Sequence, residues 1–431
     1  MSRSLGWRSV SIESIAAAEK WSLNGGPFGS KLVSSMYVAE GVPVIRGANL
    51  SADARFCDEG FVFVSADKAR ELRAHAARPG DVIFTQRGTL GQVGLIPPSA
   101  NFSTYIVSQS QMKLTVDSRI ADAAYVYYTF RCPGVVAEFV SRASSSGVPH
   151  VNLQTLRDFP IWLPHIGGQR RIASILSAYD DLIEVNQRRI AILEEMARRL
   201  FDEWFVRFRY PGHEAEEFVE TELGRTPSRW SLGIVADCAQ LISRGIAPTY
   251  DDGATGIVVN QKCIRDQRLS LEQARRQSKI VPDEKLLRYG DLVINSTGVG
   301  TLGRVAQVLV SHADTTVDSH VTIVRAVRNV DLQFFGLQIL RLEPQFERQG
   351  VGSTGQTELS RKAIADTAIL IPPQRLMVDF GRIVAPIRAQ AELLRQQNTR
   401  LRAARDLLLP KLISGEIEIG RAEATFAVAA E

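Results

Sequence analysis

Residues 78–84 read RPGDVIF, and residues 288–294 read RYGDLVI. Each stretch is a Gly-Asp turn followed by a short apolar run, the pattern of a strand that enters a buried sheet. The two stretches lie 210 residues apart, and other similar pairs occur in the same order at nearly the same spacing. A period of this length is far longer than a solenoid repeat, so it predicts a duplicated domain.

Further matches support the duplication. Trp7 is matched by Trp230, residues 25–30 by 242–248, residues 37–49 by 250–260, and residues 88–93 by 300–305. Residues 111–116 alternate between apolar and polar side chains, which predicts a strand with one buried face, and residues 320–324 are their counterpart. Each half therefore reads as a mixed α/β domain of roughly 150 residues.

Two long helices are predicted in matching places after the two domains. From Gln169 to Phe208 there is neither Pro nor Gly, and apolar residues recur at alternating steps of three and four, which is a heptad seam. The first seam is Ile172, Ile175, Tyr179, Leu182, Leu193, Met196, Leu200 and Trp204, interrupted by Asn186 and Arg189. The second, between about Gln374 and Leu409, is Val384, Ile387, Ala391, Leu394, Asn398, Leu401, Arg405 and Leu408. The fold class is α+β: two mixed α/β domains separated by two long helices that form an antiparallel coiled coil.

Each helix carries an Asn near its middle, Asn186 in the first and Asn398 in the second. A buried Asn in a helical seam costs stability but fixes register. If the helices pack antiparallel about a pseudo-two-fold axis, the two side chains should lie close together; the alternative is that each faces solvent. Pro211-Gly212 should end the first helix, and Pro386 should kink the second or mark its first turn.

Composition restricts the class of protein. Hydrophobic residues make up 45% and charged residues 23% of 431, which excludes a wholly disordered chain. We expect no transmembrane helix, because no run of 18 apolar residues occurs, and no signal peptide, because residues 1–7 lack an apolar core. The four cysteines form no C-x-x-C pair, so we expect a cytoplasmic protein. A net charge of +4 permits nucleic-acid binding without requiring it.

No motif predicts an active site. Residues 298–303 spell G-x-G-x-x-G, but a strand-like run follows instead of a helix, so we interpret them as a turn between two strands. Asp81 and Asp291 lack acidic partners for Mg²⁺ and are interpreted as turn caps. The six His residues form no H-E-x-x-H or similar cluster. The chain is therefore predicted to have no catalytic residue, no metal and no cofactor of its own.

Polar, Gly-rich loops recur in both halves, at 84–88, 144–150, 294–298 and 352–356. Of the 51 basic residues 42 are Arg, which either suits phosphates and guanine edges or reflects the codon bias of a GC-rich genome. If the chain binds DNA, Arg46, Arg87 and Arg244 are candidate contacts, and Lys31 and Lys262 would contact phosphates. The full set of candidate DNA-binding residues is Lys31, Arg46, Asn49, Gln86, Arg87, Arg244, Asn260, Lys262, Asn295 and Thr297.

With these features, the chain resembles the specificity subunit of type I DNA restriction-modification systems. The resemblance is carried by residues 25–30, 80–83, 163–173, 355–359 and 408–417, in the expected order over nearly the whole chain. It implies two target recognition domains, each reading one half of a split, asymmetric DNA sequence. The implied division is a first recognition domain at 1–165, a first coiled-coil helix at 166–210, a linker and second recognition domain at 211–373, a second helix at 374–420 and a tail at 421–431.

The resemblance also implies partners. The coiled coil would dock two methyltransferase subunits, which bind S-adenosylmethionine, and restriction subunits that use ATP and Mg would join the same core. The chain itself would bind double-stranded DNA, contact no membrane and catalyse nothing. A fused enzyme would need an S-adenosylmethionine loop and an Asn-Pro-Pro-Tyr-like run, which the sequence lacks. A coiled-coil adaptor with two polypeptide-binding domains remains the alternative.

Overall fold

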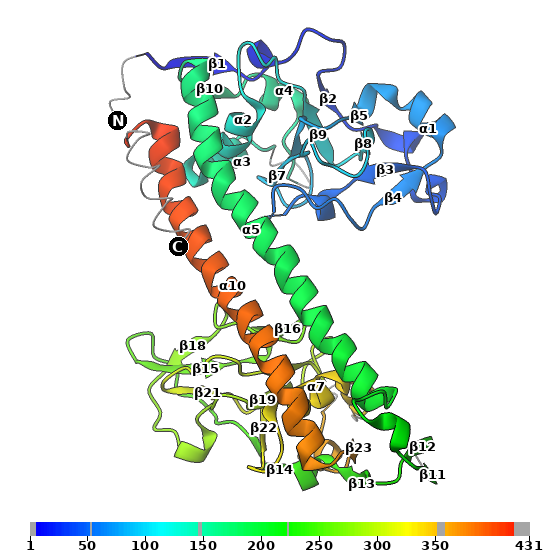
Figure 1. Ribbon diagram of the computed structural model, residues 1–431. Coiled ribbons are helices and arrows are strands. Elements are labelled where there is room, and N and C mark those ends of the chain that lie inside the picture. Colours follow the sequence, from blue (N-terminus) through cyan, green and yellow to red (C-terminus); the bar gives the residue numbers. More distant parts are fainter. Residues whose placement is uncertain (1–5, 52–53, 145–148, 222–223, 351–357, 418–431) are drawn as a thin grey trace. The chain divides into compact units, whose positions relative to one another are not determined.

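The computed structural model of the chain describes residues 6–51, 54–144, 149–221, 224–350 and 358–417. It divides into two compact units, the first formed by residues 1–188 and 395–431 and the second by residues 189–394. Each unit contains a sheet-rich domain and one end of each of two long helices (Figure 1). The predicted class, mixed α/β domains with two long helices, is confirmed.

The first unit is built on an antiparallel sheet in the order β2-β9-β6-β7. These strands are Leu23–Gly25, Gln111–Leu114, Val82–Thr85 and Val93–Leu95. A second sheet, in the order β4-β3-β8-β5, joins Val62–Val64, Val42–Ile45, Tyr105–Val107 and Ala76–Ala77, with β3 and β8 parallel. β1 (Arg8–Ser11) pairs with β10 (Pro160–Leu163). The short helices are α1 (Ala66–Glu71), α2 (Ala123–Thr129), α3 (Pro133–Ser141) and α4 (Leu153–Arg157).

The second unit repeats this topology. Its antiparallel sheet β14-β22-β19-β20 joins Ala239–Arg244, Val321–Ala326, Leu292–Asn295 and Val305–Gln307. The sheet β18-β15-β21 joins Arg275–Gln277, Gly256–Val259 and Thr315–Val317, with β15 and β21 parallel. β13 (Ser231–Ile234) pairs with β23 (Ala368–Ile371) as β1 pairs with β10. The helices are α6 (Val235–Cys238), α7 (Leu332–Arg341), α8 (Glu343–Arg348) and α9 (Arg361–Ala365).

Two small antiparallel ribbons complete the second unit. β11 (Phe218–Thr221) pairs with β12 (Gly224–Pro227), and β16 (Ile264–Arg265) pairs with β17 (Arg268–Leu269). Figure 1 shows the strands of the first unit mainly in blue and cyan and those of the second mainly in green and yellow. The order and pairing sense of the central four strands agree between the units, and so does the parallel pair of the second sheet, although β5 and α1 of the first unit have no counterpart in the described part of the second; the topology therefore supports the predicted duplication.

The central sheets are buried on both faces. β9 and β22 are buried along their whole lengths, so the expectation that residues 111–116 expose one face is wrong. In the second unit Leu292 and Ile294 belong to one hydrophobic cluster, whereas Val293 and Ile323 belong to another. Successive side chains of a strand point to opposite faces of the sheet. The cluster that contains Val293 and Ile323 therefore covers the face that the apolar–polar alternation had predicted to be exposed to solvent.

The Gly-Asp and Gly-rich turns fold as predicted. The backbone N–H of Arg78 donates to Asp81 Oδ2 at 3.0 Å, and that of Arg288 donates to Asp291 Oδ2 at 2.8 Å. Residues 298–303 connect the antiparallel strands β19 and β20. Both carboxylates therefore cap turns, and the G-x-G-x-x-G stretch is a hairpin connection.

The two long helices are α5 (Ile166–Phe201) and α10 (Gln374–Ser414). α5 continues into a π-helical turn at Asp202–Val206 and ends there, before Pro211, because Phe208 adopts a positive φ of 58°. α10 continues through Pro386, so the interpretation of that residue as a first-turn position is wrong. Among the helices in the described part of the chain, none combines the length and hydropathy needed to cross a membrane.

The seam of α10 is largely as predicted, but the seam of α5 is not. Leu182 is only partly buried and Met196 is 49% exposed, whereas Ile183, Ile190 and Ala197 are buried. A strict 3.5-residue repeat drifts from a helix of 3.6 residues per turn. The buried residues of α5 follow the 3.6-residue period of the helix instead. Beyond Asn186, some apolar residues at the heptad positions therefore lie outside the buried stripe.

Candidate nucleic-acid interface

In each unit the strands of the central sheet end beside equivalent loops. We call the residues at these strand ends and in these loops the polar edge. In the first unit it consists of Gly25, Arg46, Gln86, Arg87, Ser110 and Gln111; in the second, of Arg244, Asn260, Ser296, Thr297, His320 and Val321. Equivalent contacts define the correspondence: the backbone N–H of Gln86 donates to Ser110 O at 2.7 Å, and that of Ser296 to His320 O at 2.9 Å. Most of the residues chosen from the sequence lie at or next to this edge.

Asn49 organises the loop that carries Arg46. Its side chain is 1% exposed; Oδ1 accepts the Arg46 N–H at 2.9 Å, and Nδ2 donates to the carbonyls of Cys57 and Glu59, each at 3.0 Å. The amide is thus fully used inside the loop. Arg46 is partly buried, and its guanidinium reaches the carbonyl of Gly60 at 3.4 Å.

The remaining first-unit candidates differ in exposure. Arg87 and Lys31 are exposed, the latter at the end of a short 3-10 helix, Gly29–Lys31. Gln86 is 4% exposed, and its Oε1 has no hydrogen-bond partner among the described residues. The Nε2 of the fully buried Gln111 is likewise unpartnered within that part of the chain. Arg87 and Lys31 can reach a ligand directly, whereas the Gln86 and Gln111 amides lie beneath the surface.

In the second unit Asn260 caps the 3-10 helix Gln261–Cys263. Its Oδ1 accepts the backbone N–H of Lys262 at 2.9 Å, and its Nδ2 donates to Gln273 O at 2.7 Å. Asn260 follows strand β15 as Arg46 follows strand β3, so both units hold this loop with side-chain caps. The cap leaves Lys262 exposed.

Asn295 and Thr297 belong to one hydrogen-bond network around Gln261. Asn295 is fully buried and its Nδ2 donates to Gln261 O at 3.1 Å, while its Oδ1 has no partner among the described residues. Gln261 Nε2 donates to Thr297 Oγ1 and O at 2.5 and 2.6 Å, and Thr297 Oγ1 also lies 2.9 Å from His320 Nδ1. The network fixes Thr297 and His320 at the polar edge.

Arg244 lies at the end of β14, in the place that Gly25 takes in the first unit. Its Nη2 donates to Glu358 Oε1 at 2.7 Å and to Leu359 O at 2.9 Å. Beside it opens a groove of about 680 Å³. The groove is lined by Ile242, Arg244, Ser319, Glu358, Ser360, Arg361, Lys362 and Ala365. The sequence reasoning missed Arg361 and Lys362, whose only signal was their place directly after the helix cap Ser360.

Residues 145–148 and 352–357, in two of the predicted polar loops and one motif of the family resemblance, lie outside the described residues. So does the tail from residue 418. Within the described ranges no group of three or more His, Cys, Asp and Glu side chains is placed to hold a metal ion.

The structure brings Asn186 and Asn398 together within the first unit. Asn186 Nδ2 donates to Asn398 Oδ1 at 3.0 Å and to Gln397 Oε1 at 2.9 Å, and Asn398 Nδ2 donates to Ile183 O at 3.3 Å. Both Asn side chains are buried, at 1% and 3% exposure. The alternative that each faces solvent is therefore wrong, and their role in fixing register remains a prediction.

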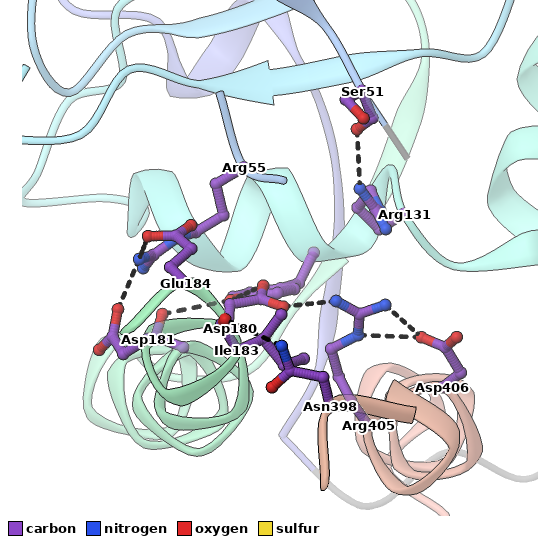
Figure 2. Close-up of polar contacts among 12 residues, drawn as sticks. Ser51, Arg55, Arg131, Asp180, Asp181, Ile183, Glu184, Asn398, Arg405 and Asp406 are labelled. Carbon is purple, nitrogen blue, oxygen red and sulfur yellow. Dashed lines mark hydrogen bonds and ion pairs between the residues drawn. The ribbon is translucent and has the colours of Figure 1, made fainter. Parts of the chain in front are cut away.

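A buried ion pair lies along the same helices. Arg405 Nη1 donates to Asp180 Oδ1 at 2.5 Å (Figure 2). The hydroxyl of Tyr128 on α2 donates to Asp180 Oδ2 at 2.7 Å. Burial acts to lower the pKa of Arg405, but pairing with Asp180 and Asp406 outweighs it and raises that pKa. The pair joins α5, α10 and the first sheet domain.

Each domain is also tied to α5 by an Arg: Arg55, from a loop, in the first unit and Arg268, from strand β17, in the second. Arg55 Nε and Nη2 donate to Glu184 at 2.9 and 2.8 Å, and Nη2 also contacts Asp181 at 2.5 Å (Figure 2). In the second unit Arg268 contacts Glu194 at 2.6 and 3.2 Å. Such bidentate Arg–carboxylate contacts fix orientation as well as distance.

Comparison with known proteins agrees with this architecture. The family model described as "Type I restriction modification DNA specificity domain" matches residues 42–195. The type I restriction enzyme MjaIX specificity subunit of Methanocaldococcus jannaschii is 25% identical over 351 residues, 79% of this chain and 78% of that protein. The HindI specificity subunit of Haemophilus influenzae is 21% identical, over 79% of this chain and 87% of that protein. The crystal structure of the type I restriction-modification S subunit from M. genitalium has a TM-score of 0.61 at 13% identity, covering 96% and 97% of the two chains.

Proposed function

We propose that this chain, which belongs to the family of type I restriction-modification specificity subunits, reads a bipartite and asymmetric DNA target with one half-site for each unit. This family is the one that the chain resembles in its sequence motifs. The relatives of the chain are named specificity subunits, which are non-catalytic. The two half-sites, their spacing and the partner subunits are the parts that we propose.

One observation carries the proposal: the polar edge is built twice on the same strands but with different side chains. Where the first unit has the exposed Arg87, the second has the partly buried Thr297, and where the first has the partly buried Ser110, the second has the exposed His320. Base pairs are distinguished in the major groove by their patterns of donors, acceptors and methyl groups. Two copies of one reading surface that present different hydrogen-bonding groups are therefore suited to two different half-sites.

Exposure sorts the candidate contacts into roles. Arg87 is the strongest candidate for a base contact in the first unit, and its loss should cost ~1–3 kcal/mol and relax specificity at one position. Lys31 and Lys262 are exposed and suited to phosphates, so their loss should weaken binding to all sequences alike. Asn49 holds the loop that carries Arg46, and Asn260 holds the loop that carries Lys262.

The proposal extends to partners. The family suggests that the helix pair docks two methyltransferase subunits that bring S-adenosylmethionine, and that restriction subunits using ATP and Mg join them in the cytoplasm. On this proposal the chain is a soluble protein whose role is to hold its two reading surfaces and its docking helices in position.

The test is methylome sequencing of DNA from cells that express the chain with its neighbouring methyltransferase-like gene. We expect a modified, split motif that disappears when this chain is deleted. Exchanging residues 1–165 or 225–373 with those of a relative of different specificity should then change one half of the motif and leave the other. Absence of any motif with active partners would contradict the proposal and favour the adaptor alternative.

A further inference from the structure

We propose that the groove beside Arg244 in the second unit, lined by Arg244, Arg361 and Lys362, binds a phosphate of the DNA backbone. The inference rests on the proposed DNA-binding function and deepens it, because it assigns a phosphate site to Arg361 and Lys362, which carry no assignment from the sequence, and gives Arg244, a candidate DNA contact, a phosphate as its ligand. It also makes the two units unequal in how they hold DNA.

One of the three cations of the groove, Arg361, is not balanced by a carboxylate among the described residues. Arg361 is exposed, and no hydrogen bond or ion pair of its side chain occurs among the described residues. Lys362 pairs with Asp366 at 2.5 Å and Arg244 pairs with Glu358, whereas Arg361 lines the same groove as Arg244 without such a pair. Burial lowers the pKa of Arg244, Glu358 opposes this, and the charge of Arg361 lowers that pKa further. An anion between the two guanidinium groups would relieve their repulsion.

The first unit indicates that the fold does not require these cations. Ser360 caps α9 by accepting the N–H of Ala363, and Asn152 caps the equivalent α4 by accepting the N–H of Thr155. The residues that follow are Arg361 and Lys362 in the second unit but Leu153 and Gln154 in the first. Gly25 likewise takes the place of Arg244. One topology thus forms with and without the charges, so their presence calls for a ligand of the second unit alone.

Glu358 has the geometry of a competitor for that ligand. Its carboxylate accepts from Arg244 at 2.7 Å yet is 61% exposed, so it can leave without a large desolvation cost. The equivalent position in the first unit is His150. Its backbone forms an isolated antiparallel β-bridge with Arg87, as the backbone of Glu358 does with Thr297. A guanidinium binds carboxylate and phosphate through the same planar fork. Glu358 therefore occupies Arg244 in the absence of DNA, and a phosphate oxygen replaces it.

The experiment measures binding of the full-length chain, assembled with its methyltransferase subunits, to a target duplex and to an unrelated duplex over a range of salt concentrations. Each phosphate contact contributes about 0.9 to the slope of log K against log salt. The Arg361→Ala variant should lower that slope by about 0.9 for both duplexes. The matched control is Arg328→Ala, which removes an exposed Arg from the same unit outside the groove.

The Glu358→Gln variant provides the opposite test. It should tighten binding to both duplexes several-fold at low salt, whereas Glu272→Gln, which removes an exposed carboxylate of the same unit outside the groove, should do so less. Equal slopes for the Arg361 and Arg328 variants would overturn the phosphate site even though the wild-type complex binds DNA. A loss of affinity for the target duplex alone would make Arg361 a base contact and would equally overturn it. A wild-type complex that binds neither duplex would instead refute the proposed function.

Discussion

Replacing Arg405 with Met should destabilise the first unit more than almost any other single change on the long helices. The Arg405 and Asp180 side chains are 8% and 7% exposed, so the change leaves a buried carboxylate without its counter-ion. Removing one partner of a buried pair costs about 3–5 kcal/mol. The Tyr128 hydroxyl still donates to Asp180, which places the expected cost near the lower end of that range, about 3 kcal/mol. Asp406 is 60% exposed and adds little when its ion pair is lost.

The assay is urea denaturation, with hydrogen exchange of α2 as a local reporter for the first unit. The matched control is Arg400→Met on the same helix, where the side chain is exposed and a change within about 0.5 kcal/mol is expected. The double variant Asp180→Asn with Arg405→Met removes both charges and should recover most of the loss, to within about 1–2 kcal/mol of wild type. If Arg405→Met cost no more than the control, or if the double variant were no more stable than Arg405→Met, the reasoning from an uncompensated buried charge would be refuted.

Three further outcomes follow from the packing. Asn186→Ala leaves the buried amide of the facing helix without its donor and should cost about 1–3 kcal/mol in the same denaturation assay. Gly26→Ala and Gly245→Ala should each abolish folding of their own unit, as measured by limited proteolysis, because a Cβ would lie 1.9 Å from a backbone carbonyl oxygen; Gly134→Ala, with open space and a helical position, should be neutral or stabilising. Burial lowers the pKa of His75, so the unfolded chain takes up its proton first, and the melting temperature should fall as pH drops below about 6.5, less steeply in a His75→Gln variant.

The duplication and the helix pair could be predicted from the sequence because both depend on local patterns. Gly-Asp turns before apolar runs predicted the strands β6 and β19. The matching positions of the two Asn residues, 212 residues apart, predicted that their side chains lie close together, and they are hydrogen-bonded. The ion partner of Arg405 was missed. Asp180 directly follows a seam residue, Tyr179, and the heptad description gave no reason to place a carboxylate in the interface.

Burial and pairing of individual polar side chains could not be predicted. Asn49 was a candidate DNA-binding residue in the sequence, yet its amide is used entirely within its own loop. Arg244 was expected to be available and is held by Glu358, 114 residues further along the chain. Such contacts depend on how distant loops meet at a sheet edge, and residue type does not encode that. Arg361 and Lys362 were overlooked for the same reason.

The duplication offers a way to separate residues that hold the fold from residues that serve recognition, using this chain alone. Gly26 and Gly245, like Asp81 and Asp291, share both residue type and contact: each Gly packs against a backbone carbonyl, and each Asp caps the same turn. A position that must do one physical task in both units keeps one residue. At the polar edge the backbone hydrogen bonds are kept, while the exposed side chains diverge, as Arg87 does from its counterpart Thr297 and His320 from its counterpart Ser110; these side chains are available to distinguish two ligands. If that division is correct, exchanging only the exposed side chains of the polar edge between the units should alter DNA preference with little change in stability. Exchanges at paired structural positions outside the edge, such as Thr115 and Arg325 beside the two Asp caps, should do the reverse.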